Sequence, residues 1–343
     1  MEEGSRHATQ RNGWVWCALS AVLFGAATPA TKLAVDHVGA VTLAGLLYLG
    51  AAGAIAPFAF REQRPTSSVR QRSRLLTAVA LGGGLAPILL ILALDRTPAA
   101  TVSLFLNLEL VATVVIARAF LKEHIGRRAA LGIVIVLLGG VILAGSSHAS
   151  VAVGALLVAA ACICWGIDNA ITASLDSYTP SQITLAKGVV AGSVNLVLGL
   201  ALDGAPVAQF VFVALAIGAV GYGLSITMWI TGARLVGAAR GQVIFALAPF
   251  IGALLAWRVN GDRLTSTMVV AFTVSLVGVL VVATSHHSHF HRHEAMEHAH
   301  PIDPSDPHHR SGAIVVLSGT QHRHLEVSHE HEHLPDIHHR HDH

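Results

Sequence analysis

Four ionisable side chains lie inside long apolar stretches of this sequence: Lys32, Glu109, Asp168 and Lys187. A charge in hydrocarbon costs about 2.5–3.5 kcal/mol on insertion scales, so such residues usually bind a ligand, relay charge or pair with one another. We therefore take these four positions as the first candidates for binding a small solute or exchanging a proton.

Glu109 stands near the middle of its apolar stretch and cannot easily face lipid. Two interpretations follow from the sequence. The carboxylate lines a cavity, or it is half of a structural ion pair with Lys32 or Lys187. The first interpretation makes Glu109 a candidate for taking up and releasing a proton.

Two polar stripes run along the same stretch. Glu109 and Thr113 share one helical face, whereas Ser103 and Asn107 lie on nearly the opposite face, because two residues rotate a helix by about 200°. We expect one stripe to line a cavity and the other to pack against a neighbouring helix.

Asp168 belongs to the segment WGIDNAIT. Trp165 and Thr172 share its helical face and Asn169 is beside it, which together would form a ligand-binding wall. The alternative is that Asp168 sits near the membrane interface and pairs with a loop.

The two lysines also allow two interpretations. Lys187 is one turn into its segment, where it would snorkel to the cytoplasmic surface or serve a cavity or gate. Lys32 follows Thr28 by one turn, with Pro29 loosening the helix between them, and it would snorkel or join the site. The candidate substrate-binding set is Glu109, Asp168, Asn169, Trp165, Lys187, Lys32, Thr28, Asn107, Tyr222 and Gln242.

The composition indicates a membrane protein. Hydrophobic residues make up 53% of the 343 residues and charged residues 12%, and several apolar runs are long enough to cross a bilayer. The backbone must be helical there, because hydrocarbon offers it no hydrogen-bond partner. We predict spans at 14–35, 38–60, 75–94, 99–120, 129–146, 152–173, 182–202, 210–232, 238–257 and 265–285.

The short loops predict the orientation. Arginine and lysine gather in alternate loops, which places those loops in the cytoplasm. Both termini are then cytoplasmic, and we expect a multi-pass protein of the cell inner membrane with residues 1–13 as a cytoplasmic N-terminus. The basic residues that set this orientation are Arg61, Arg64, Arg70, Arg72, Arg74, Lys122, Arg127, Arg128, Arg234 and Arg240.

The sequence contains an internal repeat. Residues 99–146 align without gaps with residues 238–285, so that loop meets loop and Glu123 meets Asp262. Each half, 14–146 and 152–285, holds five spans, an odd number, so the second half enters the membrane upside down. We predict an all-α integral membrane fold of ten helices in two inverted five-helix repeats, a layout found in many secondary transporters.

These features resemble the EamA family of the drug/metabolite transporter superfamily. The likeness rests on the ten spans, on the pairs Phe24-Gly25 and Trp165-Gly166 that open each half, and on the acids after the fourth helices. Members often have a proline in both fourth helices; here Pro249 keeps it and Leu110 does not. A basic residue is also frequent near Lys187. The resemblance implies alternating-access transport, commonly export, of small metabolites or related compounds.

Residues 286–343 form a histidine-rich tail whose polar composition predicts disorder. Its H-x-H repeats suit weak binding of zinc, nickel, copper or cobalt, without the fixed spacing of a structural zinc site. The candidate metal ligands are His287, His289, His291, His293, His329, His331, His333, His338, His339, His341 and His343.

Other function classes find little support. No nucleotide-binding loop, nucleophile elbow or HExxH motif occurs, so we expect no enzyme activity, no required cofactor and no nucleic-acid partner. The expected partners are the lipid bilayer, a small solute and protons as coupling ion. The alternatives are a divalent metal-ion carrier and a metal-sensing membrane scaffold that use the tail.

Overall fold

We analysed a computed structural model of the chain. It describes residues 2–63, 65, 67–121, 126–145, 149–175, 177–236 and 238–284, and short tail segments at 288–293, 296–299, 314–318, 321–324 and 327–332. The chain divides into two units, Met1–Thr284 and Ser285–His343. Each is described by itself.

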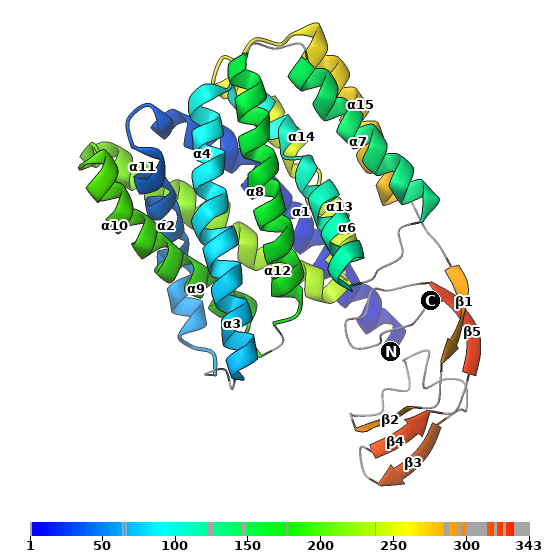
Figure 1. The fold of residues 1–343 in the computed structure, drawn as a ribbon. Helices are drawn as coiled ribbons and strands as arrows, with labels where there is room; N and C mark the ends of the chain where they lie inside the picture. Colours follow the sequence, from blue (N-terminus) through cyan, green and yellow to red (C-terminus); the bar gives the residue numbers. More distant parts are fainter. Residues whose placement is uncertain are drawn as a thin grey trace. The chain divides into compact units, whose positions relative to one another are not determined.

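The first unit is a helical bundle (Figure 1). Among the described residues, ten helical segments are long and apolar enough to cross a membrane. The first five are built from α1 (Glu2–Val35), α2 (Ala40–Ala59), α3 (Val69–Ala78) with η1 (Val79–Leu85) and α4 (Ala86–Arg96), α5 (Ala99–Phe105) with α6 (Leu108–Leu121), and α7 (Arg127–Gly145).

The second five repeat this order. They are α8 (Ala149–Ala173), α9 (Pro180–Ala186) with η2 (Lys187–Ala191) and α10 (Gly192–Asp203), α11 (Ala208–Ile217) with η3 (Gly218–Leu224) and α12 (Ser225–Val236), α13 (Ala238–Phe245) with α14 (Ala248–Val259), and α15 (Ser266–Ala283). The predicted number and order of spans are confirmed. One boundary differs: α1 continues back to Glu2, through the segment that we expected to precede the first helix.

The two halves interlock. The first helix of each half packs against the third and fourth spans of the other: α1 contacts α12 and α14, and α8 contacts α4 and α6. The second spans pair as α2 with α10, and the fifth as α7 with α15, which lie side by side in Figure 1. Glycines allow these close approaches, since a Cβ on Gly45 would strike the backbone of Leu196, and one on Gly132 the carbonyl of Gly278.

Irregular turns recur at equivalent places in the repeat. The α5–α6 span is broken at residues 106–107 and the α13–α14 span at 246–247. The wide π-helical turns η1 and η3 correspond as well, since the separation that aligns Ala99 with Ala238 also aligns Val79 with Gly218. Such turns in a helix often mark functional positions.

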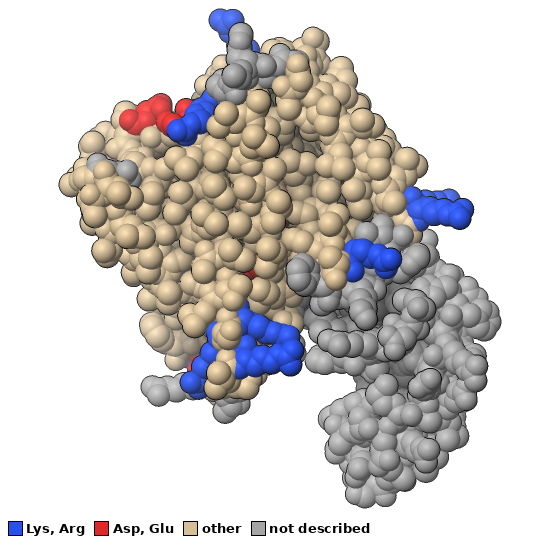
Figure 2. All heavy atoms as spheres, in the orientation of Figure 1, with Lys and Arg blue, Asp and Glu red and all other residues tan. Residues whose placement is uncertain are grey.

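Contacts between loops define two ends of the bundle. At one end Glu62 accepts hydrogen bonds from Thr179 and Ser181. At the other end the carboxylate of Asp262 accepts a hydrogen bond from the backbone N–H of Ala100 at 2.7 Å. Lys and Arg gather at the lower end of the bundle in Figure 2, where α3 begins. The loops therefore alternate between the two ends, as consecutive spans require.

The tail unit contains short strands: β1 (Ser288–His293), β2 (Met296–Ala299), β3 (Ile314–Ser318), β4 (Gln321–His324) and β5 (Val327–Glu332). β1 and β5 pair antiparallel, with His289 opposite His331 and His291 opposite His329. β4 pairs with both β2 and β3. His287, His333, His338, His339, His341 and His343 lie outside the described residues, and for those residues the disorder of the tail stays a prediction.

The orientation can be tested by cysteine labelling. Ser68, which caps α3 at the basic end, and Leu264, which is exposed in the opposite loop, are suitable probe positions. We expect a membrane-impermeant maleimide added to intact cells to modify Leu264→Cys and to spare Ser68→Cys, because basic loops remain cytoplasmic. Labelling of Ser68→Cys without labelling of Leu264→Cys would show that the orientation is the reverse of the predicted one.

Candidate functional site

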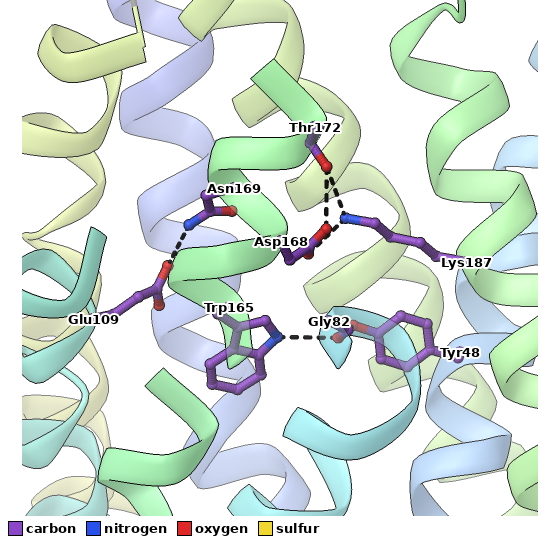
Figure 3. Close-up of polar contacts among 8 residues, drawn as sticks. All are labelled: Tyr48, Gly82, Glu109, Trp165, Asp168, Asn169, Thr172 and Lys187. Carbon is purple, nitrogen blue, oxygen red and sulfur yellow. Dashed lines mark hydrogen bonds and ion pairs between the residues drawn. The ribbon is translucent and has the colours of Figure 1, made fainter. Parts of the chain in front are cut away.

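Asp168 and Lys187 form a buried ion pair between α8 and η2 (Figure 3). Lys187 Nζ lies 2.7 Å from Asp168 Oδ2, and the two side chains are 4% and 5% exposed. Thr172 donates a hydrogen bond to Asp168 Oδ1 at 3.1 Å and accepts one from Lys187 at 3.4 Å. The two charges are therefore compensated inside the bundle. The interpretations in which Asp168 pairs with a loop and Lys187 snorkels to the surface are wrong.

The wide turn η1 supports this ion pair from the first half. The carbonyl oxygen of Gly82 accepts hydrogen bonds from the Tyr48 hydroxyl at 2.6 Å and from Trp165 Nε1 at 3.1 Å. A Cβ on Gly82 would collide with the Asp168 carboxylate, which therefore rests against a bare Cα. One glycine thus positions an aromatic pair and a carboxylate together.

Glu109 lies in the first turn of α6 and is 8% exposed. Asn169 Nδ2 donates a hydrogen bond to Glu109 Oε1 at 3.0 Å, and the side chain of Gln242 also hydrogen-bonds to this carboxylate. Lys187 pairs with Asp168, and Lys32 Nζ donates to the carbonyl of Leu94 at 2.5 Å. The proposed ion pair between Glu109 and either lysine is therefore absent.

A cavity between the two halves collects these groups. We call it the polar cavity; its volume is about 40 Å³, which holds a few water molecules but not a metabolite. Both halves contribute walls, from α1, α2 and α6 in the first and from α8, η2, α12 and α13 in the second. Its lining includes Phe24, Tyr48, Glu109, Trp165, Asp168, Asn169, Thr172, Lys187, Trp229 and Phe245.

A second cavity lies against the same carboxylate. We call it the small cavity; its volume is about 10 Å³, and Glu109, Thr28, Ser103 and Gln242 are among its lining residues. Ser103 and Glu109 thus reach one cavity, so the expectation that their stripes lie on opposite faces is wrong. The reason is the break at residues 106–107, because the 3.6-residue periodicity of a helix does not continue across it.

Three candidate residues lie outside both linings. Lys32 is half-buried and bonds to α4, as given above. Asn107 Nδ2 donates to the carbonyl of Leu104 at 2.9 Å and so caps the end of α5. The ring of Tyr222 packs 5.5 Å from the ring of Tyr48, behind the cavity wall.

Sequence reasoning missed Tyr48 and the role of Gly82 as a hydrogen-bond acceptor. A polar aromatic residue within an otherwise apolar second span was the signal for Tyr48. The run of three glycines at 82–84 indicated a break in helix geometry, but nothing in it identifies which carbonyl is used or by which side chains.

The fold and the site define a multi-pass membrane protein of two interlocked five-helix halves with a buried charged cavity between them. The sequence pattern of the EamA-like transporter family matches residues 11–145 and again residues 152–284. The chain belongs to this family, which confirms the resemblance seen in the sequence.

One curated protein and one solved structure are also similar to this chain. An uncharacterized transporter of Methanothermobacter thermautotrophicus is 28% identical over 218 residues, which are 61% of this chain and 63% of that protein. The match therefore spans less than two thirds of that relative's length. A solved structure titled "Crystal structure of protein" has a TM-score of 0.58 and 16% identity, and covers 81% of this chain and 98% of its own, so it has a similar fold.

The support that Gly82 gives to the ion pair leads to a test. Gly82→Ala should lower the free energy of unfolding by roughly 1–3 kcal/mol, because the added methyl group displaces the Asp168 carboxylate from Lys187. Gly84→Ala is the matched control, since its Cβ would meet only the carbonyl of Val79 at 3.7 Å. Thermal unfolding in detergent measures both. Equal stability of the two variants would show that Asp168 does not depend on the bare Cα.

Proposed function

We propose that this protein is a secondary transporter that exports small metabolites or related compounds by alternating access of its two halves. The observation that carries the proposal is the buried ion pair Asp168–Lys187 beside Glu109, in a cavity walled by both halves. Charged groups within membrane spans are retained where they serve a substrate or ion path. The transport cycle requires no cofactor.

The chemistry of the polar cavity supports a solute with a polar or charged group on an apolar body. Phe24, Trp165, Trp229 and Phe245 supply aromatic walls, and the carboxylates and the ammonium group supply the polar contacts. A solute with one positive and one negative group would bind Asp168 through the first and Lys187 through the second, in place of the ion pair between them. Since the cavity has room only for water in this conformation, the solute binds when the halves separate at one end.

Interlocked packing supports alternating access. α1 packs on the third and fourth spans of the second half, and α8 packs on those of the first. Because the halves repeat each other, opening the bundle at one end and opening it at the other would involve equivalent contacts. Exchanging which end is open then requires no new kind of contact. This is the physical basis of transport in folds with inverted repeats.

A divalent metal-ion carrier is the second candidate. The backbone register of β1 and β5, which sets His289 opposite His331 and His291 opposite His329, favours it, since histidine is a residue type that binds transition metals. In that case the tail would collect or sense the ion.

A first experiment identifies the solute and tests the ion pair. The purified protein is screened for thermal stabilisation by a metabolite library and by divalent metals, and counterflow in liposomes is measured for each hit. Asp168→Asn should lower the free energy of unfolding by about 3–5 kcal/mol, because it leaves the Lys187 ammonium buried and unpaired. The double variant Asp168→Asn, Lys187→Met should regain most of that stability and still fail in counterflow. Counterflow at the wild-type rate in the double variant would remove the pair from the mechanism.

A second experiment separates the two candidate functions. Deleting residues 287–343 should leave unfolding and solute counterflow unchanged, because the repeated bundle ends before the tail and forms a unit of its own. Loss of flux with unchanged unfolding, together with loss of stabilisation by Zn²⁺ or Ni²⁺, would favour the metal carrier.

A further inference from the structure

The small cavity contains oxygen atoms that have no partner. Ser103 Oγ and Gln242 Oε1 have no hydrogen-bond partner among the described residues, although Ser103 is fully buried and Gln242 is only 4% exposed. Buried polar atoms are nearly always paired, so unpaired oxygen atoms around a cavity indicate that a water molecule or an ion binds there. Thr28 supplies a further hydroxyl to the lining, and Glu109 a carboxylate.

The carboxylate of Glu109 also lacks a compensating charge. No lysine or arginine among the described residues forms an ion pair with it, since the ion pairs found there are Asp168–Lys187 and Asp95–Arg96. The hydrogen bond that the Asn169 amide donates to Glu109 Oε1 can be accepted by the ionised and by the protonated carboxyl group. An isolated ionised carboxylate is costly to bury, so without a cation the neutral form is favoured, whereas a cation bound beside Glu109 would hold the carboxylate ionised.

The backbone beside this cavity has a carbonyl without a regular helical partner. Pro249 has no N–H, so the carbonyl of Phe245, four residues earlier, has no regular helical partner. Phe245 and Pro249 both line the small cavity. Freed carbonyls and the C-terminal ends of half-helices are the groups that coordinate cations in transporters with broken helices.

We propose that the small cavity is a binding site for a single Na⁺, held by the Glu109 carboxylate, the Ser103 and Thr28 hydroxyls and the Gln242 amide oxygen. All four donors are oxygen atoms, the ligand type that hard cations prefer, and the single carboxylate balances one positive charge rather than two. The volume of about 10 Å³ admits one small occupant. The role of this Na⁺ as coupling ion rests on the proposed transport function, but its binding does not. In this role the proposal names Na⁺, whereas the sequence predicts a proton.

The test uses NaCl alone as the probe. The unfolding temperature of the purified full-length protein is measured while NaCl replaces choline chloride at constant ionic strength and pH, with KCl in a parallel series. We expect a saturable rise with Na⁺ that choline does not give and that requires higher concentrations of K⁺. Glu109→Gln should abolish the rise, and Ser103→Ala should raise the Na⁺ concentration at half-saturation about tenfold.

Ser275→Ala is the matched control, because Ser275 is a buried serine outside the lining of both cavities. It should keep the wild-type response to Na⁺. If Glu109→Gln does not fold, binding of ²²Na⁺ to Ser103→Ala, Ser275→Ala and wild type decides the question. No Na⁺ response in the wild type, or equal responses to Na⁺, K⁺ and choline, would disprove the site. Solute counterflow that persists in such a protein would leave the transport proposal intact.

Discussion

Uncompensated charge cannot be left in the middle of a bilayer, and the described bundle is arranged around this constraint. Lys187 Nζ and Asp168 Oδ2 form an ion pair at 2.7 Å. The ion pair alone leaves the other carboxylate oxygen and the other ammonium hydrogens without hydrogen-bond partners. Thr172 supplies one further bond to each, and the bare Cα of Gly82 allows the carboxylate to approach η1. The pair therefore depends on three spans at once, and a movement of any one of them changes its energy.

The irregular turns explain how hydrocarbon-buried helices can provide polar contacts at all. A regular helix pairs its interior carbonyls within the segment, so that a side chain or an ion finds only their second lone pair. The wide turn η1 lets Gly82 accept from Tyr48 and Trp165, and the breaks at 106–107 and 246–247 open two other spans beside Glu109. The repeat sets η1 at the position equivalent to η3 and the break at 106–107 at the position equivalent to 246–247. These irregular turns are thus common to both halves, whereas the charged side chains are not.

Hydropathy and the internal alignment were sufficient for the spans, their order and the repeat, because bilayer thickness and backbone pairing leave few other solutions. Asp168, Asn169 and Glu109 could be selected because ionisable and amide groups are rare in such segments. Their hydrogen-bond and ion-pair partners could not be predicted. Contacts between spans depend on how each helix is rotated about its axis and how deep it lies in the membrane, which the local sequence does not encode. Ser103 shows the limit most clearly. Its relation to Glu109 depends on a break that contains no proline in the first half, where Leu110 replaces the residue equivalent to Pro249.

The asymmetry of the side chains gives the two cavities different tasks. In the repeat Asp168 corresponds to Ala27 and Glu109 to Ala248, so each charge is present once although the fold presents its position twice. Glu109 borders both cavities, with the ion pair in one and the unpaired oxygens of Ser103 and Gln242 in the other. A positive charge in the small cavity would fix Glu109 and, through its hydrogen bond to Asn169, would hold α8 and the neighbouring Asp168 in place. Loss of that charge would strand a carboxylate next to the ion pair and weaken the closed arrangement. Occupancy of one cavity would therefore alter the affinity of the other through a single shared carboxylate, which is the reciprocal linkage that coupled transport requires.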